Sequence, residues 1–305
     1  MEKSVKIRVP ATSANCGPGF DCLGVACTMY NELSLTLKKE PGVEIQVEGE
    51  GAENIPTDER NLAWRSIQTL LRRAKADDTY RGASIRMKNG VPLSRGLGSS
   101  AAAIVGALKA ANVALGNPYD RRGLLQIATD LEGHPDNVAP AIYGGFTVSL
   151  VQDGVPESFS FLPRLPLKMV VAIPAFHLST KAARDALPAN VPMKDAVFNV
   201  GRAAMLVGAL AKGNETFLRH AFEDALHQPY RAKLIPGMYE VFDAAREAGA
   251  LGVAMSGAGP CIIAYTTAHA EAIGDAMVET FRRHEVEARA VVLGVEERGA
   301  YIVKE

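Results

Sequence analysis

The chain has 305 residues, of which 48% are hydrophobic and 22% charged, and its formal net charge is −1. This length allows two domains or one large one, and the composition is that of an ordinary globular protein. Lysine and arginine are spread along the chain, which argues against a nucleic-acid footprint or a basic membrane-binding face.

The cysteines and the most apolar stretch give no sign of export or of a membrane span. The four cysteines are Cys16, Cys22, Cys27 and Cys261. Because they show neither a disulfide framework nor a zinc spacing, we expect reduced thiols in a cytoplasmic protein. The charged N-terminus leads into a strand, so no signal peptide is expected. Residues 99–115 are apolar but contain Lys109 and Asn112, which predicts a buried helix.

The first half of the chain mixes strand and helix patterns. Alternating hydrophobicity predicts strands over residues 5–9, 31–37, 43–47, 83–87 and 146–150. Helical spacing predicts helices over residues 61–73, 101–115 and 121–131, with Asn61 and Asp120 as caps. Pro10 is expected to end the first strand. Residues 11–24, which are small and polar, are expected to form an irregular loop of the kind that lines sites.

The second half begins near two prolines, Pro163 and Pro166, which predict domains over residues 1–163 and 164–305. Strands are expected over residues 167–173, 252–255, 261–265 and 288–293. Helices are expected over residues 181–186, 193–212, 215–226, 236–248 and 269–284. Together the two halves predict an α+β fold, and the order of elements in the second is compatible with a ferredoxin-like domain.

The functional interpretation of the sequence depends most on residues 91–102, VPLSRGLGSSAA. Gly96 and Gly98 permit a tight loop, and Ser99 or Ser100 is expected to cap the helix that follows. The free N–H groups and the positive dipole end of such a helix attract anions. The stretch therefore predicts a phosphate-binding loop. A glycine loop that only caps a buried helix is the alternative.

Two better-known glycine loops fit this stretch less well. A dinucleotide fingerprint needs its glycines directly after a strand, whereas a turn at residues 88–90 precedes this loop. A Walker loop needs a lysine after its last glycine, and Ser99 stands there instead.

Residues 132–137, EGHPDN, place four polar side chains within six positions. Mg²⁺ prefers hard oxygen ligands, which Glu132 and a serine of the glycine loop could supply. A helix end with Gly133 as its cap and Pro135 as its stop explains the same residues without a ligand.

Two further features of the second half have a structural and a functional interpretation. Residues 256–260, SGAGP, join two apolar strands, which favours a tight hairpin over a lip that covers a nucleotide. Arg184, one turn beyond Thr180, and Arg231 could together bind a carboxylate or phosphate through bidentate contacts. Solvated surface arginines are the alternative.

Taken in order, these stretches resemble the GHMP kinase superfamily and, within it, the homoserine kinase family. The glycine loop resembles the ATP-binding signature of the superfamily, and residues 256–260 resemble its third motif. Residues 10–24, 134–140, 179–184 and 227–231 resemble forms peculiar to homoserine kinases. The resemblance implies an N-terminal half like ribosomal protein S5 domain 2 and a ferredoxin-like C-terminal half. It also implies phosphorylation of L-homoserine by ATP and Mg²⁺ to O-phospho-L-homoserine, a step towards threonine, in the cytoplasm.

The resemblance also implies roles for single residues. The ATP-binding residues would be Asn61, Pro92, Leu93, Ser94, Arg95, Gly96, Leu97, Gly98, Ser99, Ser100, Ala101 and Gly257. Ser100 and Glu132 would hold Mg²⁺. Asp21 would bind the substrate ammonium group, and Arg184 and Arg231 its carboxylate. The residues around the reacting hydroxyl would be Asn15, His134, Asn137 and Thr180, and Asn15 would also contact the substrate.

Several alternatives stay open at this point. Asp136 could be a general base or a structural residue. The protein could be a kinase for mevalonate or a sugar, although the motifs of those relatives are absent. It could also be a non-catalytic sensor or RNA-binding module, against which the intact phosphate loop and Glu132 argue. A small-molecule substrate is expected, with no nucleic-acid or membrane partner, and a homodimer is an option that the sequence does not decide.

Overall fold

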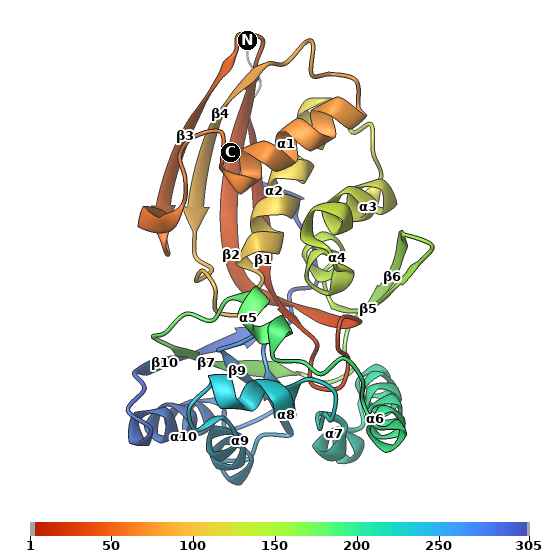
Figure 1. Cartoon of the computed structure of the whole chain (residues 1–305), viewed down its shortest axis with the longest axis vertical. Helices are drawn as coiled ribbons and strands as arrows, with labels where there is room; N and C mark the ends of the chain where they lie inside the picture. Colours follow the sequence, from red (N-terminus) through yellow and green to blue (C-terminus); the bar gives the residue numbers. More distant parts are fainter. Residues whose placement is uncertain (1–3, 304–305) are drawn as a thin grey trace.

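The computed structural model describes residues 4–303 and arranges them as two β-sheets with helices packed on them (Figure 1). The first part of the chain contains β1 (Val5–Ala14), β2 (Leu23–Lys38), β3 (Gly42–Gly49), α1 (Leu62–Arg73), β4 (Gly82–Asn89), α2 (Ser99–Ala114), α3 (Arg121–Glu132), α4 (Pro135–Tyr143), β5 (Phe146–Gln152) and β6 (Val155–Phe161). The second part contains β7 (Lys168–Pro174), α5 (Thr180–Asp185), α6 (Met193–Lys212), α7 (Glu215–Ala221), α8 (Gln228–Arg231), α9 (Met238–Glu247), β8 (Gly252–Met255), β9 (Ile262–Thr266), α10 (Ala270–Arg283), β10 (Ala288–Gly294) and β11 (Tyr301–Ile302).

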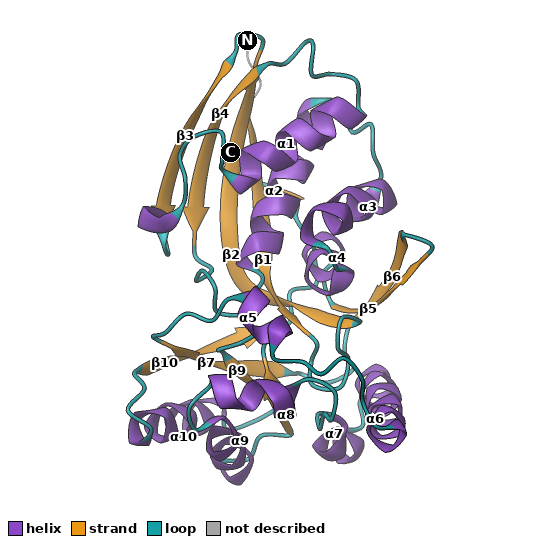
Figure 2. Ribbon diagram, in the orientation of Figure 1, coloured by secondary structure: helices purple, strands orange, loops and turns teal. Residues whose placement is uncertain are grey.

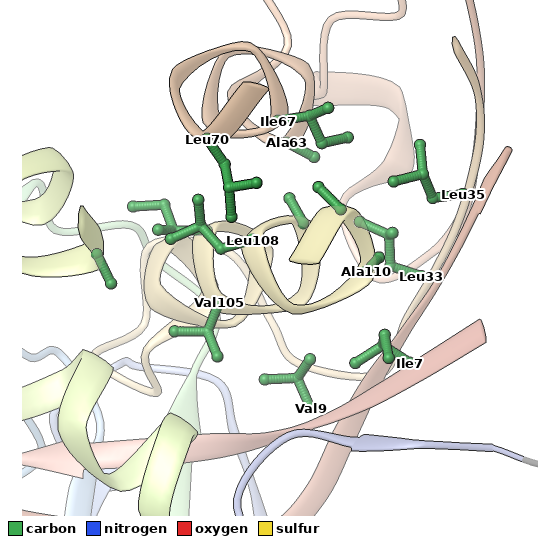
Figure 3. Close-up of a cluster of buried hydrophobic side chains, with 14 of the residues drawn as sticks. Ile7, Val9, Leu33, Leu35, Ala63, Ile67, Leu70, Val105, Leu108 and Ala110 are labelled. Atoms are coloured by element: carbon green, nitrogen blue, oxygen red, sulfur yellow. The ribbon is translucent and has the colours of Figure 1, made fainter. Parts of the chain in front are cut away.

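The first sheet has the order β11-β1-β2-β4-β3, and β5 and β6 extend it from the start of β2. Only β3 and β4 pair in parallel, while the other neighbours are antiparallel. Helix α2 lies between this sheet and α1 (Figure 3). It is buried on nearly all sides. Val105 and Leu108, for example, belong to a core that also includes Ile7, Val9 and Leu33. This packing fixes the N-terminus of α2 at the end of the sheet.

The second sheet is antiparallel, with the order β10-β7-β9-β8. When these four strands are numbered 1 to 4 in chain order, this is the 4-1-3-2 order of a ferredoxin-like domain. Helices α9 and α10 pack on this sheet (Figure 2). A second core joins the two sheets: Met169 and Tyr265 of the second sheet share a cluster with Leu23 and Val25 of β2. The expected α+β fold with two unlike halves is confirmed.

The predicted boundary between residues 163 and 164 falls between β6 and β7. After β10 the chain returns to the first sheet, where β11 pairs with β1. No helix within residues 4–303 has the combination of length and apolar character that a bilayer span requires.

Two expectations about the N-terminal region were wrong. Pro10 does not end β1, because a register shift between Pro10 and Ala11 absorbs the missing N–H and the strand continues. The loop is therefore only residues 15–22.

The predicted cap of α2 was also wrong. Gly98, in a left-handed conformation, precedes α2, and no side chain caps that helix. Ser99 and Ser100 are instead its first two residues.

The sequence patterns missed four short elements, namely α4, β6, α8 and β11, and the predicted helix over residues 215–226 ends early as α7. Helix α4 has Pro135 at its first turn and Pro140 inside it, and both hid its helical period. The caps of α1 and α3 were predicted correctly: Asn61 accepts hydrogen bonds from Ala63 N and Trp64 N, and Asp120 accepts one from Gly123 N.

Candidate active site

A cleft of about 370 Å³ is lined by residues of both halves, including Thr180 and Arg184 of α5. Figure 1 shows α5 at the junction of the two halves. Most residues with a predicted site role line it: Asn15, Asp21, Asn61, Leu93, Ser94, Arg95, Gly96, Gly98, Ser99, Ser100, Glu132, His134, Asn137, Thr180, Arg184, Arg231 and Gly257. Three do not. Leu97 and Ala101 are buried behind the glycine loop, and Pro92 lines a neighbouring hollow.

Packing against neighbouring segments shapes the glycine loop. Gly98 has a φ of 66°, and a Cβ added there would overlap with Oγ1 of Thr12. Gly96 has a φ of 80°, and a Cβ there would overlap with the carbonyl oxygen of Ser256. The hydroxyl of Ser256 donates to Gly96 O at 2.6 Å. The packing interpretation of these glycines is therefore confirmed, and the phosphate-loop interpretation stays a prediction.

Residues 256–260 form a hairpin and also line the cleft. They connect β8 and β9, which pair antiparallel, so the hairpin prediction is confirmed. Gly257, Ala258 and Gly259 line the cleft at the same time. Gly257 N donates to Ala14 O at 3.1 Å, which holds the hairpin against β1.

The N-terminus of α2 brings free N–H groups and two oxygen-bearing side chains together. No side chain caps this helix end. Ser100 Oγ donates to Glu132 Oε2 at 2.7 Å, so the carboxylate stands beside the helix N-terminus. Burial raises the pKa of Glu132. The pair offers hard oxygen ligands next to an anion-binding helix end, which is the donor set that Mg²⁺ prefers.

Helix α4 presents a second polar group to the cleft. His134 Nδ1 contacts Oδ1 of the buried Asp136, and this hydrogen bond raises the pKa of His134. Asn137 Oδ1 accepts a hydrogen bond from Thr12 Oγ1 at 2.9 Å. The amide nitrogen of Asn137 is thereby left as a donor for a ligand.

At the other end of the cleft, an acid and an arginine meet from positions far apart in the sequence. Arg184 donates to both carboxylate oxygens of Asp21, at 2.9 and 3.0 Å. Asp21 lies in the loop over residues 15–22 with a φ of 55°. Asn15 closes that loop: its Oδ1 accepts from Asp21 N at 3.0 Å, and its Nδ2 donates to Gly257 O at 2.8 Å.

Arg231 lies behind this pair and is not a solvated surface residue. It is 2% exposed, and its Nε donates to Ala183 O at 3.0 Å. Burial, and then the neighbouring Arg184, lower the pKa of its guanidinium to about 10, so it stays charged at neutral pH. The two guanidiniums lie 5.4 and 5.2 Å from the ring centroid of Phe20. One acid and two arginines around an aromatic ring suit a small zwitterion.

The sequence did not reveal the apolar part of the cleft. Ile55, Pro56, Met87 and Ala103 line it beside Asn61, and no motif marks them. The polar atoms of Asn61 are already used, since Oδ1 caps α1 and Nδ2 donates to Pro56 O. Asn61 therefore shapes this wall and holds its backbone. Such a wall suits a flat heterocycle.

Two family models match the chain. GHMP kinases N terminal domain matches residues 61–145, and GHMP kinases C terminal matches residues 205–283. The homoserine kinase of Carboxydothermus hydrogenoformans is 48% identical, over 97% of this chain and 96% of that protein. The homoserine kinase of Moorella thermoacetica is 46% identical, over 97% and 99% of the two chains.

Solved structures agree with this relation. The homoserine kinase of Cytophaga hutchinsonii superposes with a TM-score of 0.90 at 33% identity, covering 99% of this chain and 98% of that one. The mevalonate kinase of L. major in complex with R-mevalonate, at 17% identity and a TM-score of 0.72, shares the fold over 98% and 100% of the two chains. The chain therefore belongs to the GHMP kinases and, within them, to the homoserine kinase family.

Proposed function

We propose that the protein transfers the terminal phosphoryl group of ATP to the side-chain hydroxyl of L-homoserine, giving O-phospho-L-homoserine and ADP. One observation carries this proposal: a helix-borne phosphate loop shares a single cleft with one acid and two arginines that match an amino-acid zwitterion. Relatives at 40–48% identity over nearly the whole chain bear the name homoserine kinase, which supports the choice of acceptor.

In this proposal the glycine loop and the N-terminus of α2 hold the ATP phosphates. The free N–H groups of α2 favour negative charge, and the small residues let the backbone approach it closely. The adenine base of ATP lies against the apolar wall near Asn61 and Met87. Glu132 and Ser100 hold Mg²⁺, which neutralises charge on the phosphates when it is bound.

The acceptor is held at both ends of its backbone. Asp21 takes the ammonium group, and Arg184 and Arg231 take the carboxylate. Substrate binding therefore breaks the Asp21–Arg184 ion pair and gives each of these two side chains a charged group of the substrate. The hydroxyl then faces Asn137, Thr180, His134 and Asn15. Phosphoryl transfer needs positioning and charge neutralisation more than a strong base. Asp136 therefore serves to orient His134, to which it is bound.

A substrate panel tests the proposed function. The purified protein is incubated with ATP, Mg²⁺ and either L-homoserine, mevalonate or galactose, and ADP release and the phosphorylated product are measured. We expect product with L-homoserine alone. Phosphorylation of mevalonate but not of homoserine would identify a different kinase of the superfamily, and no ADP release with any acceptor would indicate a non-catalytic member.

Asp21→Ala is expected to raise the KM for L-homoserine about a hundredfold and to change the KM for ATP less than about twofold. The variant loses the charged partner of the ammonium group, while the phosphate loop is untouched. Steady-state kinetics with each substrate varied in turn measure both constants. Asp185→Ala removes an exposed carboxylate of the neighbouring α5 as the control. Equal increases in both KM values would contradict the role of Asp21.

Glu132→Gln is expected to lower kcat about a hundredfold and to shift the Mg²⁺ dependence to higher concentrations. Burial raises the pKa of Glu132, so in the wild type the ionised ligand is lost as the pH falls, and Mg²⁺ affinity falls with it. Glutamine does not titrate, so the variant does not show this loss of Mg²⁺ affinity at low pH. Mg²⁺ titrations of activity at several pH values measure this, with Asp130→Asn on the same helix as the control. Unchanged kcat and Mg²⁺ dependence would show that Glu132 is not a ligand.

A further inference from the structure

His227 stands immediately before α8 and has no part in the transfer just described. A buried carboxylate fixes its backbone: Asp224 Oδ2 accepts from His227 N at 2.9 Å and from Gln228 N at 2.6 Å. The same side chain binds Asn199 Nδ2 of α6 at 2.9 Å, and Asn199 Nδ2 also donates to Pro18 O. The backbone of His227 is therefore tied to α6 and to the loop over residues 15–22.

The imidazole of His227 makes two hydrogen bonds, and together they define its tautomer. Its Nε2 lies 2.8 Å from Gly17 O, and since a carbonyl oxygen only accepts, Nε2 carries the proton. Its Nδ1 lies 3.2 Å from Arg231 Nη1, which only donates, so Nδ1 is the acceptor. The ring is fully buried, and Phe20 packs against it with 5.3 Å between ring centroids.

The charges around the ring agree with a neutral imidazole. Burial lowers the pKa of His227, and the guanidinium of Arg231 lowers it further, whereas Asp224 and Asp21 oppose this. A proton on Nδ1 would point at a cationic donor at 3.2 Å. The neutral ring instead joins Arg231 to the loop that carries Asp21.

These contacts leave Arg231 with a defined orientation. Nε binds Ala183 O, and Nη1 binds the imidazole and, at 3.4 Å, Gly257 O. Within residues 4–303, Nη2 has no hydrogen-bond partner, and Arg231 lines the cleft. The guanidinium is thus fixed on one side and available to a carboxylate on the other.

We infer that His227 is a positioning residue of the amino-acid subsite: through its Nε2–H tautomer it sets the orientation of Arg231 relative to the Asp21 loop, and so the recognition of the substrate carboxylate. This inference rests on the proposed function for its kinetic consequence. The hydrogen bonds of His227 themselves join only residues of this chain.

Two substitutions separate the two contacts. In His227→Gln, the amide nitrogen takes the place of Nε2 and keeps the bond to Gly17 O, but Arg231 loses its acceptor. In His227→Asn, the amide oxygen takes the place of Nδ1 and keeps the bond from Arg231. His220→Gln, at an exposed position of α7, is the control. Each variant is assayed with L-homoserine and with L-homoserine amide, which lacks the carboxylate charge.

We expect His227→Gln to reduce the preference for homoserine over its amide, as the ratio of kcat/KM values, about tenfold, with the KM for ATP within about twofold of wild type. His227→Asn and the control keep the preference. A preference unchanged in His227→Gln, or equal losses in His227→Gln and His227→Asn, would overturn the inference, since a purely structural side chain does not distinguish them.

Nitrogen-15 NMR of histidine-labelled wild-type protein provides a readout that needs no substrate, with the His227→Gln spectrum for assignment. A neutral ring protonated on Nε2 at neutral pH supports the inference, and a proton on Nδ1 overturns it. If the wild type does not phosphorylate homoserine, the proposed function fails, and this measurement still decides whether His227 holds Arg231 as described.

Discussion

Replacing Arg231 with methionine is expected to raise the KM for L-homoserine about a thousandfold while the KM for ATP stays within about twofold of wild type. Arg231 is 2% exposed and is already held by Ala183 O and His227, so its guanidinium reaches the carboxylate with little loss of entropy. Two charge-assisted hydrogen bonds of about 2 kcal/mol each account for an effect of this size.

Two companion variants make this result specific. Arg231→Lys keeps the charge but loses the planar fork, and we expect it to recover only part of the loss. Arg184→Met removes the more exposed arginine, whose side chain is 45% accessible, and we expect a smaller increase in the KM for homoserine. Neither KM value depends on the fraction of enzyme that is folded, so some destabilisation of a variant does not obscure the comparison. A larger effect at Arg184 than at Arg231 would contradict the assignment.

The parts of the fold that the sequence predicted are those with a long or strongly capped pattern. Helix α6 was predicted with its observed bounds, and the caps Asn61 and Asp120 have the side-chain bonds that their residue types favour. The missed elements depend on contacts distant in the sequence. Helix α8 has only four residues, and Asp224 completes its N-terminus from outside the helix.

The site shows the same division. The glycine loop could be predicted because it is contiguous and its residue types are unusual. The burial of Arg231 could not, because an isolated arginine in a sequence is most often exposed. The Asp21–Arg184 pair joins residues 163 positions apart, so only the resemblance to a family placed both at one substrate. The contacts of His227 with Gly17 and Arg231 had no local signal at all.

Gly98→Ala is expected to lower kcat/KM for ATP by at least about a hundredfold and to destabilise the protein by about 2 kcal/mol or more. The backbone at Gly98 is left-handed, and an added Cβ would overlap with Oγ1 of Thr12. Thr12 would have to turn away, which breaks its hydrogen bond to Asn137 and moves the start of α2. The proposed phosphate loop and the proposed acceptor side of the cleft are therefore disturbed together.

Gly116→Ala separates backbone strain from this overlap. Gly116 also has a positive φ, of 83°, but a Cβ there meets nothing within 4 Å. We expect this control to cost only about 1 kcal/mol of stability and to leave the kinetics unchanged. In the double variant Thr12→Ala with Gly98→Ala, the overlapping hydroxyl is gone, so kcat/KM for ATP should approach that of Thr12→Ala alone. If Gly98→Ala behaved like Gly116→Ala, the contact with Thr12 would not be what demands glycine in this loop.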